Sequence, residues 1–191
     1  MNNSTLLSLN TALSDYIQNI NTKNLLDEYG FKYLDEDEFK SLICNIGNNA
    51  ELSVFHLNIR SLNSNHGKLC LMLDILDFVF HVIVLTEIWT VNIDFYSNLF
   101  PGYNFYDLPE HSKVCGVGLY IKNTFTTQEL LQYKIKSPST SMVENKWYKT
   151  TKGNNKFTIG GIYRHPNGMI AEYTESLDAV LSTVASQKCH V

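Results

Sequence analysis

Three polar side chains stand where apolar, β-branched runs of the sequence end. Glu87 follows the run that starts at Val82, Asn58 follows LSVFHL, and Tyr163 closes KFTIGGIY. A carboxylate held on a rigid element is a good ligand for a hard divalent cation. An amide can donate a hydrogen bond to that carboxylate, and a tyrosine can give or take a proton. Taken singly, such residues are more often a loop acid, a turn asparagine and a strand-end aromatic with its hydroxyl in water.

Basic residues gather around the third of these strand ends. Residues 112–164 hold eight lysines, the first being Lys113, and Arg164, against only two acidic residues. Arg164 and Asn167 belong to the segment YRHPN, and arginine is the preferred planar partner of a phosphate group. Arg164, Asn167 and Lys113 are therefore candidate substrate-binding residues. A second explanation stays open, because lysines also prevent strand edges from pairing with other chains.

The elements that position Asn58 and Glu87 form a predicted strand–helix–strand unit. Residues 52–57 and 81–86 have the composition of strands buried on both faces. Between them a polar, turn-like stretch, NIRSLNSNHG, precedes KLCLMLDILDFVF, whose apolar residues recur at helical spacing. The strands of such a unit are parallel, so Asn58 and Glu87 emerge at one edge of the sheet. Trp89 is expected to pack beneath that edge.

The second half of the chain has the pattern of an antiparallel sheet followed by a helix. Strands are expected over residues 103–106, 114–121, 141–149 and 156–163. Gly116-Val117-Gly118 is expected to let its strand pass close to a neighbouring backbone. Residues 169–185 are predicted to form a helix, with one apolar stripe made of Ile170, Tyr173, Leu177, Val180, Leu181 and Val184.

Length and charge suggest one domain with an appendage. The chain has 191 residues, 44% of them apolar, enough to bury a core. Residues 1–50 carry seven acidic residues against three lysines, which accounts for the net charge of −4. This lead-in is interpreted as partly helical or disordered, with helices around residues 5–19 and 35–44, and residues 51–191 as the main domain.

The sequence disfavours a membrane protein, a disulfide-rich protein and a zinc-binding protein. No apolar run reaches the roughly 18 residues of a membrane span. The first twenty residues contain polar side chains where a signal peptide would be apolar, which favours an intracellular protein without membrane association. The four cysteines are far apart in the sequence and form no CxxC pair, so neither a zinc site nor a disulfide framework is indicated.

Five segments, taken in order, resemble the endonuclease/exonuclease/phosphatase superfamily, and above all the apurinic-endonuclease-like domain of jockey-type non-LTR retrotransposons. They are HLNIRSL, VIVLTEIWT, PGYNFY, CGVGLYIK and IGGIYRHPN. The resemblance implies an α/β fold, a four-layer sandwich of two packed mixed sheets flanked by helices, incomplete at the C-terminus. It also implies a nuclear enzyme that cuts a DNA phosphodiester with Mg²⁺, or with Mn²⁺, and without a small-molecule cofactor.

The resemblance also assigns roles to residues. Glu87 would bind the metal, Asn58 would order the site, Tyr163 would lie beside the scissile phosphate, and Arg164 would contact a nearby phosphate. Relatives of the repair-enzyme type have an aspartate at the position of Arg60. Retrotransposon members often lack this aspartate, as this chain does.

The family takes its Asp-x-Asn and Asp-His pairs from segments that would follow Val191. We therefore expect this chain to be a fragment with little or no nuclease activity. Two alternatives remain open, a phosphoesterase of the same fold that acts on a non-DNA substrate and a non-catalytic nucleic-acid-binding remnant.

Overall fold

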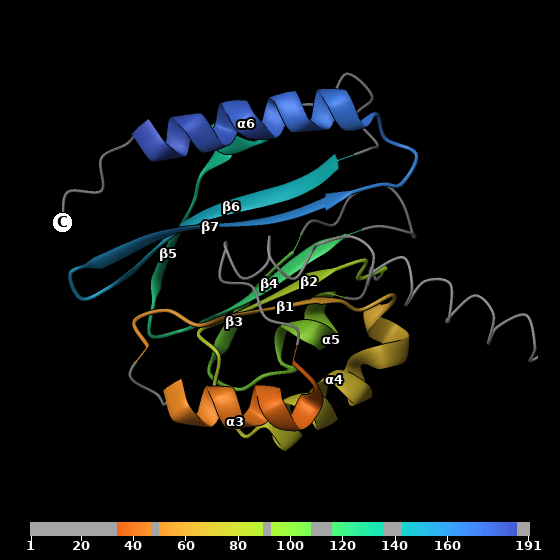
Figure 1. The fold of residues 1–191 in the computed structure, drawn as a ribbon, viewed down its shortest axis with the longest axis vertical. Coiled ribbons are helices and arrows are strands. Elements are labelled where there is room, and N and C mark those ends of the chain that lie inside the picture. The colour runs from red at the N-terminus through yellow and green to blue at the C-terminus, as the bar shows by residue number, and fades with distance from the viewer. Residues whose placement is uncertain (1–33, 47–49, 90–92, 108–115, 136–142, 187–191) are drawn as a thin grey trace, which may run out of the picture. The chain divides into compact units, whose positions relative to one another are not determined.

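The computed structural model describes residues 34–46, 50–89, 93–107, 116–135 and 143–186 (Figure 1). The chain divides into two compact units, Met1–Asn45 and Ile46–Val191. In the first unit, helix α3 (Glu36–Ile46) begins close to the predicted position. The Asp35 N–H donates to Glu38 Oε2 and the Glu38 N–H donates to Asp35 Oδ1, a reciprocal cap of the helix start. The helix predicted around residues 5–19 lies outside the described residues.

The second unit contains a four-stranded sheet, which we call the first sheet. Its strands are β1 (Val54–Asn58), β2 (Val82–Thr86), β3 (Tyr103–Asp107) and β4 (Val117–Lys122), in the order β1-β2-β4-β3. β1 and β2 are parallel and joined by helix α4 (Leu62–Leu76), which confirms the predicted strand–helix–strand unit. β4 runs antiparallel to both of its neighbours.

The two parallel strands differ in burial. Every residue of β2 is buried, as predicted. The prediction that the first strand is buried on both faces was wrong, because the residues of β1 alternate between exposed and half-buried, and Val54 is 47% exposed. β1 lies at the edge of the first sheet, with β2 as its neighbour. Its exposed residues, Val54, His56 and Asn58, share one face, and the half-buried Phe55 and Leu57 lie on the other.

Helix α4 begins earlier than predicted and includes most of the polar stretch interpreted as a turn. Ser61 caps it, since its side chain accepts a hydrogen bond from the Ser64 N–H. The Asn65 side chain donates to the carbonyls of Ile59 and Arg60, and Leu62 is fully buried. Tertiary contacts thus outweigh the weak helix propensity of the stretch. The helix ends at Leu76, so Phe80 lies outside it.

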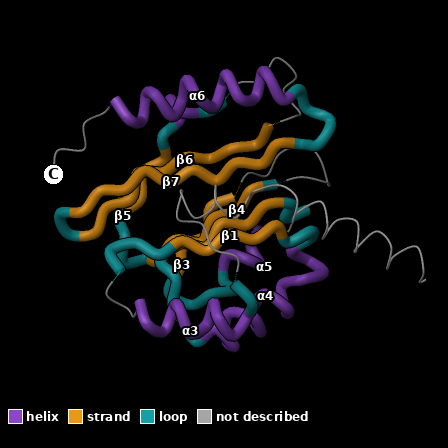
Figure 2. Tube along the Cα trace, viewed as in Figure 1, coloured by secondary structure: helices purple, strands orange, loops and turns teal. Residues whose placement is uncertain are grey.

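A second, three-stranded sheet is antiparallel throughout its described strands, whereas the resemblance implies two mixed sheets. It consists of β5 (Thr126–Glu129), β6 (Val143–Lys152) and β7 (Asn155–Arg164), of which β5 was not predicted. The remaining elements are α5 (Ile93–Ser97), a 3₁₀ turn η2 (Leu131–Tyr133) and α6 (Ile170–Ser186). Figure 2 shows the two sheets between α6 on one side and α4 and α5 on the other, the layers of an α/β sandwich.

Helix α6 matches the predicted helix in position, but its apolar stripe is only partly covered. Tyr173 and Leu177 are half-buried, whereas Ile170 is 67% exposed and Leu181 is 47% exposed. The helix lies on the second sheet alone, so described residues reach only part of the stripe (Figure 1). Among the described residues, no helix combines the length and the hydrophobicity that a membrane span requires.

The main core lies between the two sheets and leaves no room for a side chain at Gly161. Residues of β2 and β4 face residues of β6 and β7, among them Val84, Leu119, Tyr148 and Ile159. A Cβ at Gly161 would lie 2.7 Å from Val117 Cγ1 and 3.1 Å from Leu119 Cδ1. The sheets therefore approach each other closely at this point of β7, two residues before Tyr163.

We expect Gly161→Ala to lower the free energy of unfolding by about 1–3 kcal/mol, because the added methyl group overpacks the space between the sheets. Urea denaturation measures the change. Gly67→Ala is the matched control: Gly67 is exposed within α4 and a Cβ there meets nothing within 4 Å. That variant should gain about 0.5–1 kcal/mol from helix propensity. Equal stability of the two variants would contradict the close packing of the sheets.

Candidate functional site

The ends of β1 and β2 bring Asn58 and Glu87 into direct contact. The strands are parallel and Asn58 is paired with Thr86, the residue before Glu87. Asn58 Nδ2 donates a hydrogen bond of 2.8 Å to Glu87 Oε1. One carboxylate oxygen is thus oriented by the amide, as the strand-end positions of the two residues predict.

Backbone hydrogen bonds continue past the strand ends and fix the two following segments side by side. The Ile59 N–H donates to the Thr86 carbonyl at 3.0 Å, and the Ser61 N–H donates to the Glu87 carbonyl at 2.8 Å. The Leu62 N–H, at the start of α4, donates to the Ile88 carbonyl at 2.8 Å. Glu87 therefore sits on backbone that is held from both sides.

Four residues of these segments have left-handed backbone conformations. The φ angles are 46° for Arg60, 83° for Ser61, 55° for Glu87 and 46° for Trp89. Such conformations are costly for residues other than glycine and persist only where the surroundings impose them. Because they cluster at functional sites more than elsewhere, they support the interpretation of this edge as a site.

Ile88 anchors the edge in the core, and the neighbouring Trp89 buries its indole Nε1. Ile88 is 1% exposed, whereas Trp89 is half-buried. The prediction that Gly116 and Gly118 admit a neighbouring backbone was wrong, since both make room for side chains. A Cβ at Gly116 would collide with Ile88, and a Cβ at Gly118 would lie 2.8 Å from the Phe105 ring.

The second sheet reaches the same edge through Tyr163 and Glu144. The two residues are paired across β6 and β7, and the Tyr163 side chain packs against the core between the sheets. The Gly116 N–H donates to Glu144 Oε2, and the Gly116 carbonyl accepts a hydrogen bond of 3.4 Å from the Ile88 N–H. These contacts tie the Tyr163 end of β7 to the residue that follows Glu87.

Arg164 organises the turn after β7. Its Nη1 donates to the carbonyls of His165 at 3.0 Å, Pro166 at 3.3 Å and Gly168 at 2.9 Å. The Asn167 N–H donates to His165 Nδ1 at 3.2 Å. No described residue bonds to the Nε or Nη2 of Arg164. The guanidinium group thus holds the turn through Nη1 alone, as far as the described residues show.

The two sheets and their helices match those of solved structures. D. rerio TDP2 complexed with single strand DNA product is 15% identical to the chain, with a TM-score of 0.55 over 71% of this chain and 55% of that one. An endonuclease/exonuclease/phosphatase family protein from Bacteroides thetaiotaomicron is 13% identical, with a TM-score of 0.52 over 73% and 58%. The chain has the endonuclease/exonuclease/phosphatase fold.

A third match is the endonuclease domain of TRAS1, a telomere-specific non-LTR retrotransposon, at 12% identity and a TM-score of 0.49 over 68% of this chain and 53% of that one. This score does not distinguish a retrotransposon endonuclease from other proteins with the endonuclease/exonuclease/phosphatase fold. The chain spans between 53% and 58% of the length of these three structures. No protein-family model and no curated protein matches the sequence.

Asn58 and Glu87 are thus in direct contact at the strand ends, and Tyr163 is linked to the same edge through its paired residue Glu144 and through Gly116. Their roles stay predictions, as do those of Arg164 and Asn167, and Lys113 lies outside the described residues. Sequence reasoning missed Glu144. An acidic residue at position 144 could have been noticed, because it shares a face of the strand with Tyr148 and Thr150, and that face is turned towards the core.

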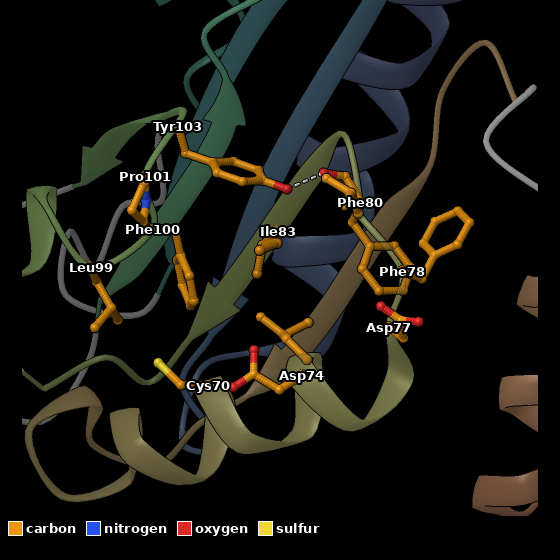
Figure 3. A pocket seen from close by; sticks show the side chains of 12 residues that line it. Cys70, Asp74, Asp77, Phe78, Phe80, Ile83, Leu99, Phe100, Pro101 and Tyr103 are labelled. Carbon is orange, nitrogen blue, oxygen red and sulfur yellow. Dashed lines mark hydrogen bonds between the residues drawn. The ribbon is translucent and has the colours of Figure 1, made fainter.

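A cavity of about 550 Å³ lies near the start of β2 and contains none of the predicted site residues (Figure 3). Cys70 and Asp74 of α4, Ile83 of β2, and Phe80 and Tyr103 line it. Burial, and then the negative charge of Asp74, raises the pKa of the Cys70 thiol. A protonated thiol is a poor nucleophile, so Cys70 is not a candidate nucleophile.

Proposed function

We propose that the chain provides the metal-binding and DNA-binding edge of a Mg²⁺-dependent DNA endonuclease of the retrotransposon type. The observation that carries this proposal is the 2.8 Å hydrogen bond from Asn58 Nδ2 to Glu87 Oε1 at the ends of two parallel strands. It gives an oriented carboxylate at the sheet edge where α/β proteins bind ligands. The segments TEIW and YRHPN favour the retrotransposon branch over other hydrolases of this fold.

Glu87 fits a hard divalent cation as a ligand. Asn58 holds its Oε1, and no described residue hydrogen-bonds to its Oε2. The described residues contain no group of three or more His, Cys, Asp and Glu side chains that could hold a metal ion. Glu87 would therefore hold Mg²⁺, or Mn²⁺, together with water and phosphate oxygens, which is the ligand set that Mg²⁺ prefers. When bound, the cation supplies positive charge that polarises a phosphoryl oxygen.

The remaining residues would hold the DNA strand against Glu87. Asn58 orients the carboxylate, and the Tyr163 hydroxyl would donate a hydrogen bond to a phosphate oxygen beside the scissile bond. The open Nε and Nη2 of Arg164 would contact a neighbouring phosphate, since guanidinium and phosphate pair well. Asn167 and Lys113 would extend these contacts along the backbone of the strand.

Two observations support DNA as the substrate. The D. rerio TDP2 structure with the same fold is a complex with a single strand DNA product. The second half of this chain also carries the local excess of lysines described above, and such a charge distribution attracts phosphate. A DNA substrate agrees with the nuclear location that the family resemblance implies.

The proposal is tested by duplex DNA binding and by nicking of supercoiled plasmid, each in Mg²⁺ and in EDTA, for the wild-type chain and for Glu87→Gln. We expect Mg²⁺ to tighten DNA binding by the wild type and not by the variant, and any nicking to require both Mg²⁺ and Glu87. Salt-dependent binding that ignores Mg²⁺ and Glu87 would identify a non-catalytic nucleic-acid-binding module instead. Phosphate release from small phosphoesters without nicking would identify a hydrolase for another substrate.

A further inference from the structure

His81 lies between the two sheets, at the opposite end of β2 from Glu87. It is 8% exposed and precedes Val82, the first residue of the strand. His81 and Glu87 are six positions apart, which corresponds to on the order of 20 Å in an extended strand. A ligand at His81 is therefore distinct from one held by Glu87.

Ser53 fixes which ring nitrogen of His81 carries the proton. The Ser53 N–H points at His81 Nδ1 from 3.1 Å, and Ser53 Oγ lies 3.0 Å from the same nitrogen. Ser53 Oγ also accepts a hydrogen bond of 3.0 Å from the His81 backbone N–H. Because a backbone N–H can only donate, Nδ1 must be the acceptor, and the proton of the neutral ring is on Nε2.

The ammonium group of Lys152 faces that Nε2–H. Lys152 Nζ, at the end of β6, lies 3.4 Å from His81 Nε2. A lysine ammonium has three donors and no lone pair, so two donors point at each other without an acceptor between them. Burial, followed by the charges of Lys152 and Lys122, lowers the pKa of His81, which keeps the ring neutral at pH 7. A protonated ring would only add a further positive charge.

The surroundings contain positive charge and an aromatic wall. The Lys122 N–H donates to the His81 carbonyl, which places Lys122 beside His81. The Phe125 ring lies 5.4 Å from the His81 ring, with Lys152 Nζ 5.5 Å from its centroid. No described carboxylate forms an ion pair with Lys122 or Lys152. Lys152 is also exposed, so an anion from solution can reach the positive charge of this group.

We propose that a phosphate-type oxyanion binds between His81 Nε2–H and Lys152 Nζ, next to Lys122. Two nitrogens 3.4 Å apart form the base of a triangle whose apex can hold one oxygen, about 2.8 Å from each nitrogen. The remaining oxygens of a tetrahedral anion would face solvent and the charge of Lys122. The anion can be free inorganic phosphate or a phosphate of a nucleic-acid backbone, since the recognised chemistry is the same.

The test follows the His81 ring by NMR in the 191-residue chain with ¹⁵N-labelled histidine. Sodium phosphate is titrated in EDTA against sodium chloride of equal ionic strength, and a second titration uses a short single-stranded oligonucleotide. EDTA removes the contribution of a metal at Glu87, so this result is independent of the proposed endonuclease function. We expect the Nε2–H tautomer in chloride and a shift of the Nε2 signals with phosphate, with the oligonucleotide, or with both.

Lys152→Gln should weaken the binding of the anion by at least about tenfold, because it removes a charge-assisted hydrogen bond. Lys149→Gln is the matched control: Lys149 is exposed on the same strand and on its other face, and its substitution should change nothing. An Nδ1–H tautomer, in which Nε2 accepts from Lys152, would overturn the proposal. So would signals that respond no more to phosphate and oligonucleotide than to chloride, or a response that survives Lys152→Gln.

Discussion

Replacing Glu87 with glutamine is expected to weaken Mg²⁺ binding to the strand ends by about 100-fold or more. Changes to residues that merely orient a metal ligand already cost about 10–100-fold, and this change removes the ligand charge itself. Among the described residues, no group of acidic and histidine side chains at this edge can replace it. Titration calorimetry with MgCl₂, repeated with MnCl₂, measures the loss without any need for cleavage.

Two further variants make this result specific. Asn58→Ala leaves Glu87 Oε1 without its 2.8 Å partner and should weaken Mg²⁺ binding by about tenfold. Glu175→Gln removes an exposed acid of α6 and should leave the affinity unchanged. If all three variants bind Mg²⁺ as the wild type does, Glu87 is not a metal ligand.

Leu85→Ala is expected to lower the free energy of unfolding by about 2–5 kcal/mol. Leu85 is 0% exposed, in a strand that is hydrogen-bonded on both sides, and its paired residue on β4 is Gly118. A glycine has no side chain that could move into the space left by the leucine, so most of the cavity should persist. Equilibrium urea denaturation, monitored by tryptophan fluorescence and by circular dichroism, measures the effect.

The matched control for this prediction is Val54→Ala on the neighbouring edge strand. Val54 is 47% exposed, so truncation removes little buried surface and should cost less than about 1 kcal/mol. A Leu85→Ala loss no larger than that of Val54→Ala would mean that β2 is not the centre of a packed core. The position of Glu87, two residues further on, would then lack its rigid support.

The sequence allowed the placement of Glu87 and Asn58 to be predicted because that placement depends on a local rule. Two parallel strands deliver the residues that follow them to one edge, and the apolar composition of β2 made this strand recognisable. For Tyr163, the sequence predicted only a position at the end of a third strand, and not how that strand end reaches the edge that carries Glu87. The contacts through Gly116 and Glu144 that bring it there join segments 28 residues apart, which no local pattern encodes.

The errors have physical causes of the same kind. The start of α4 contains asparagine, serine and glycine, which have weak helix propensity, yet the burial of Leu62 and the Asn65 side-chain bonds impose the helix. The composition of β1 suits a central strand, but only the sheet order shows that it lies at the edge. The contact of His81 with Lys152 joins the two sheets and depends on a side-chain geometry that a sequence does not show.

Thermal stability and function compete at the strand ends of this chain, because four residues there have left-handed backbone conformations: Arg60, Ser61, Glu87 and Trp89. Glycine adopts such conformations without steric penalty, whereas other residues lose roughly 1–2 kcal/mol at each position. Any search for a more heat-resistant variant would therefore favour glycine at position 87 and erase the carboxylate with it. The gain in melting temperature would come from the same substitution that removes the proposed metal ligand, so stabilising this edge is expected to reduce metal binding.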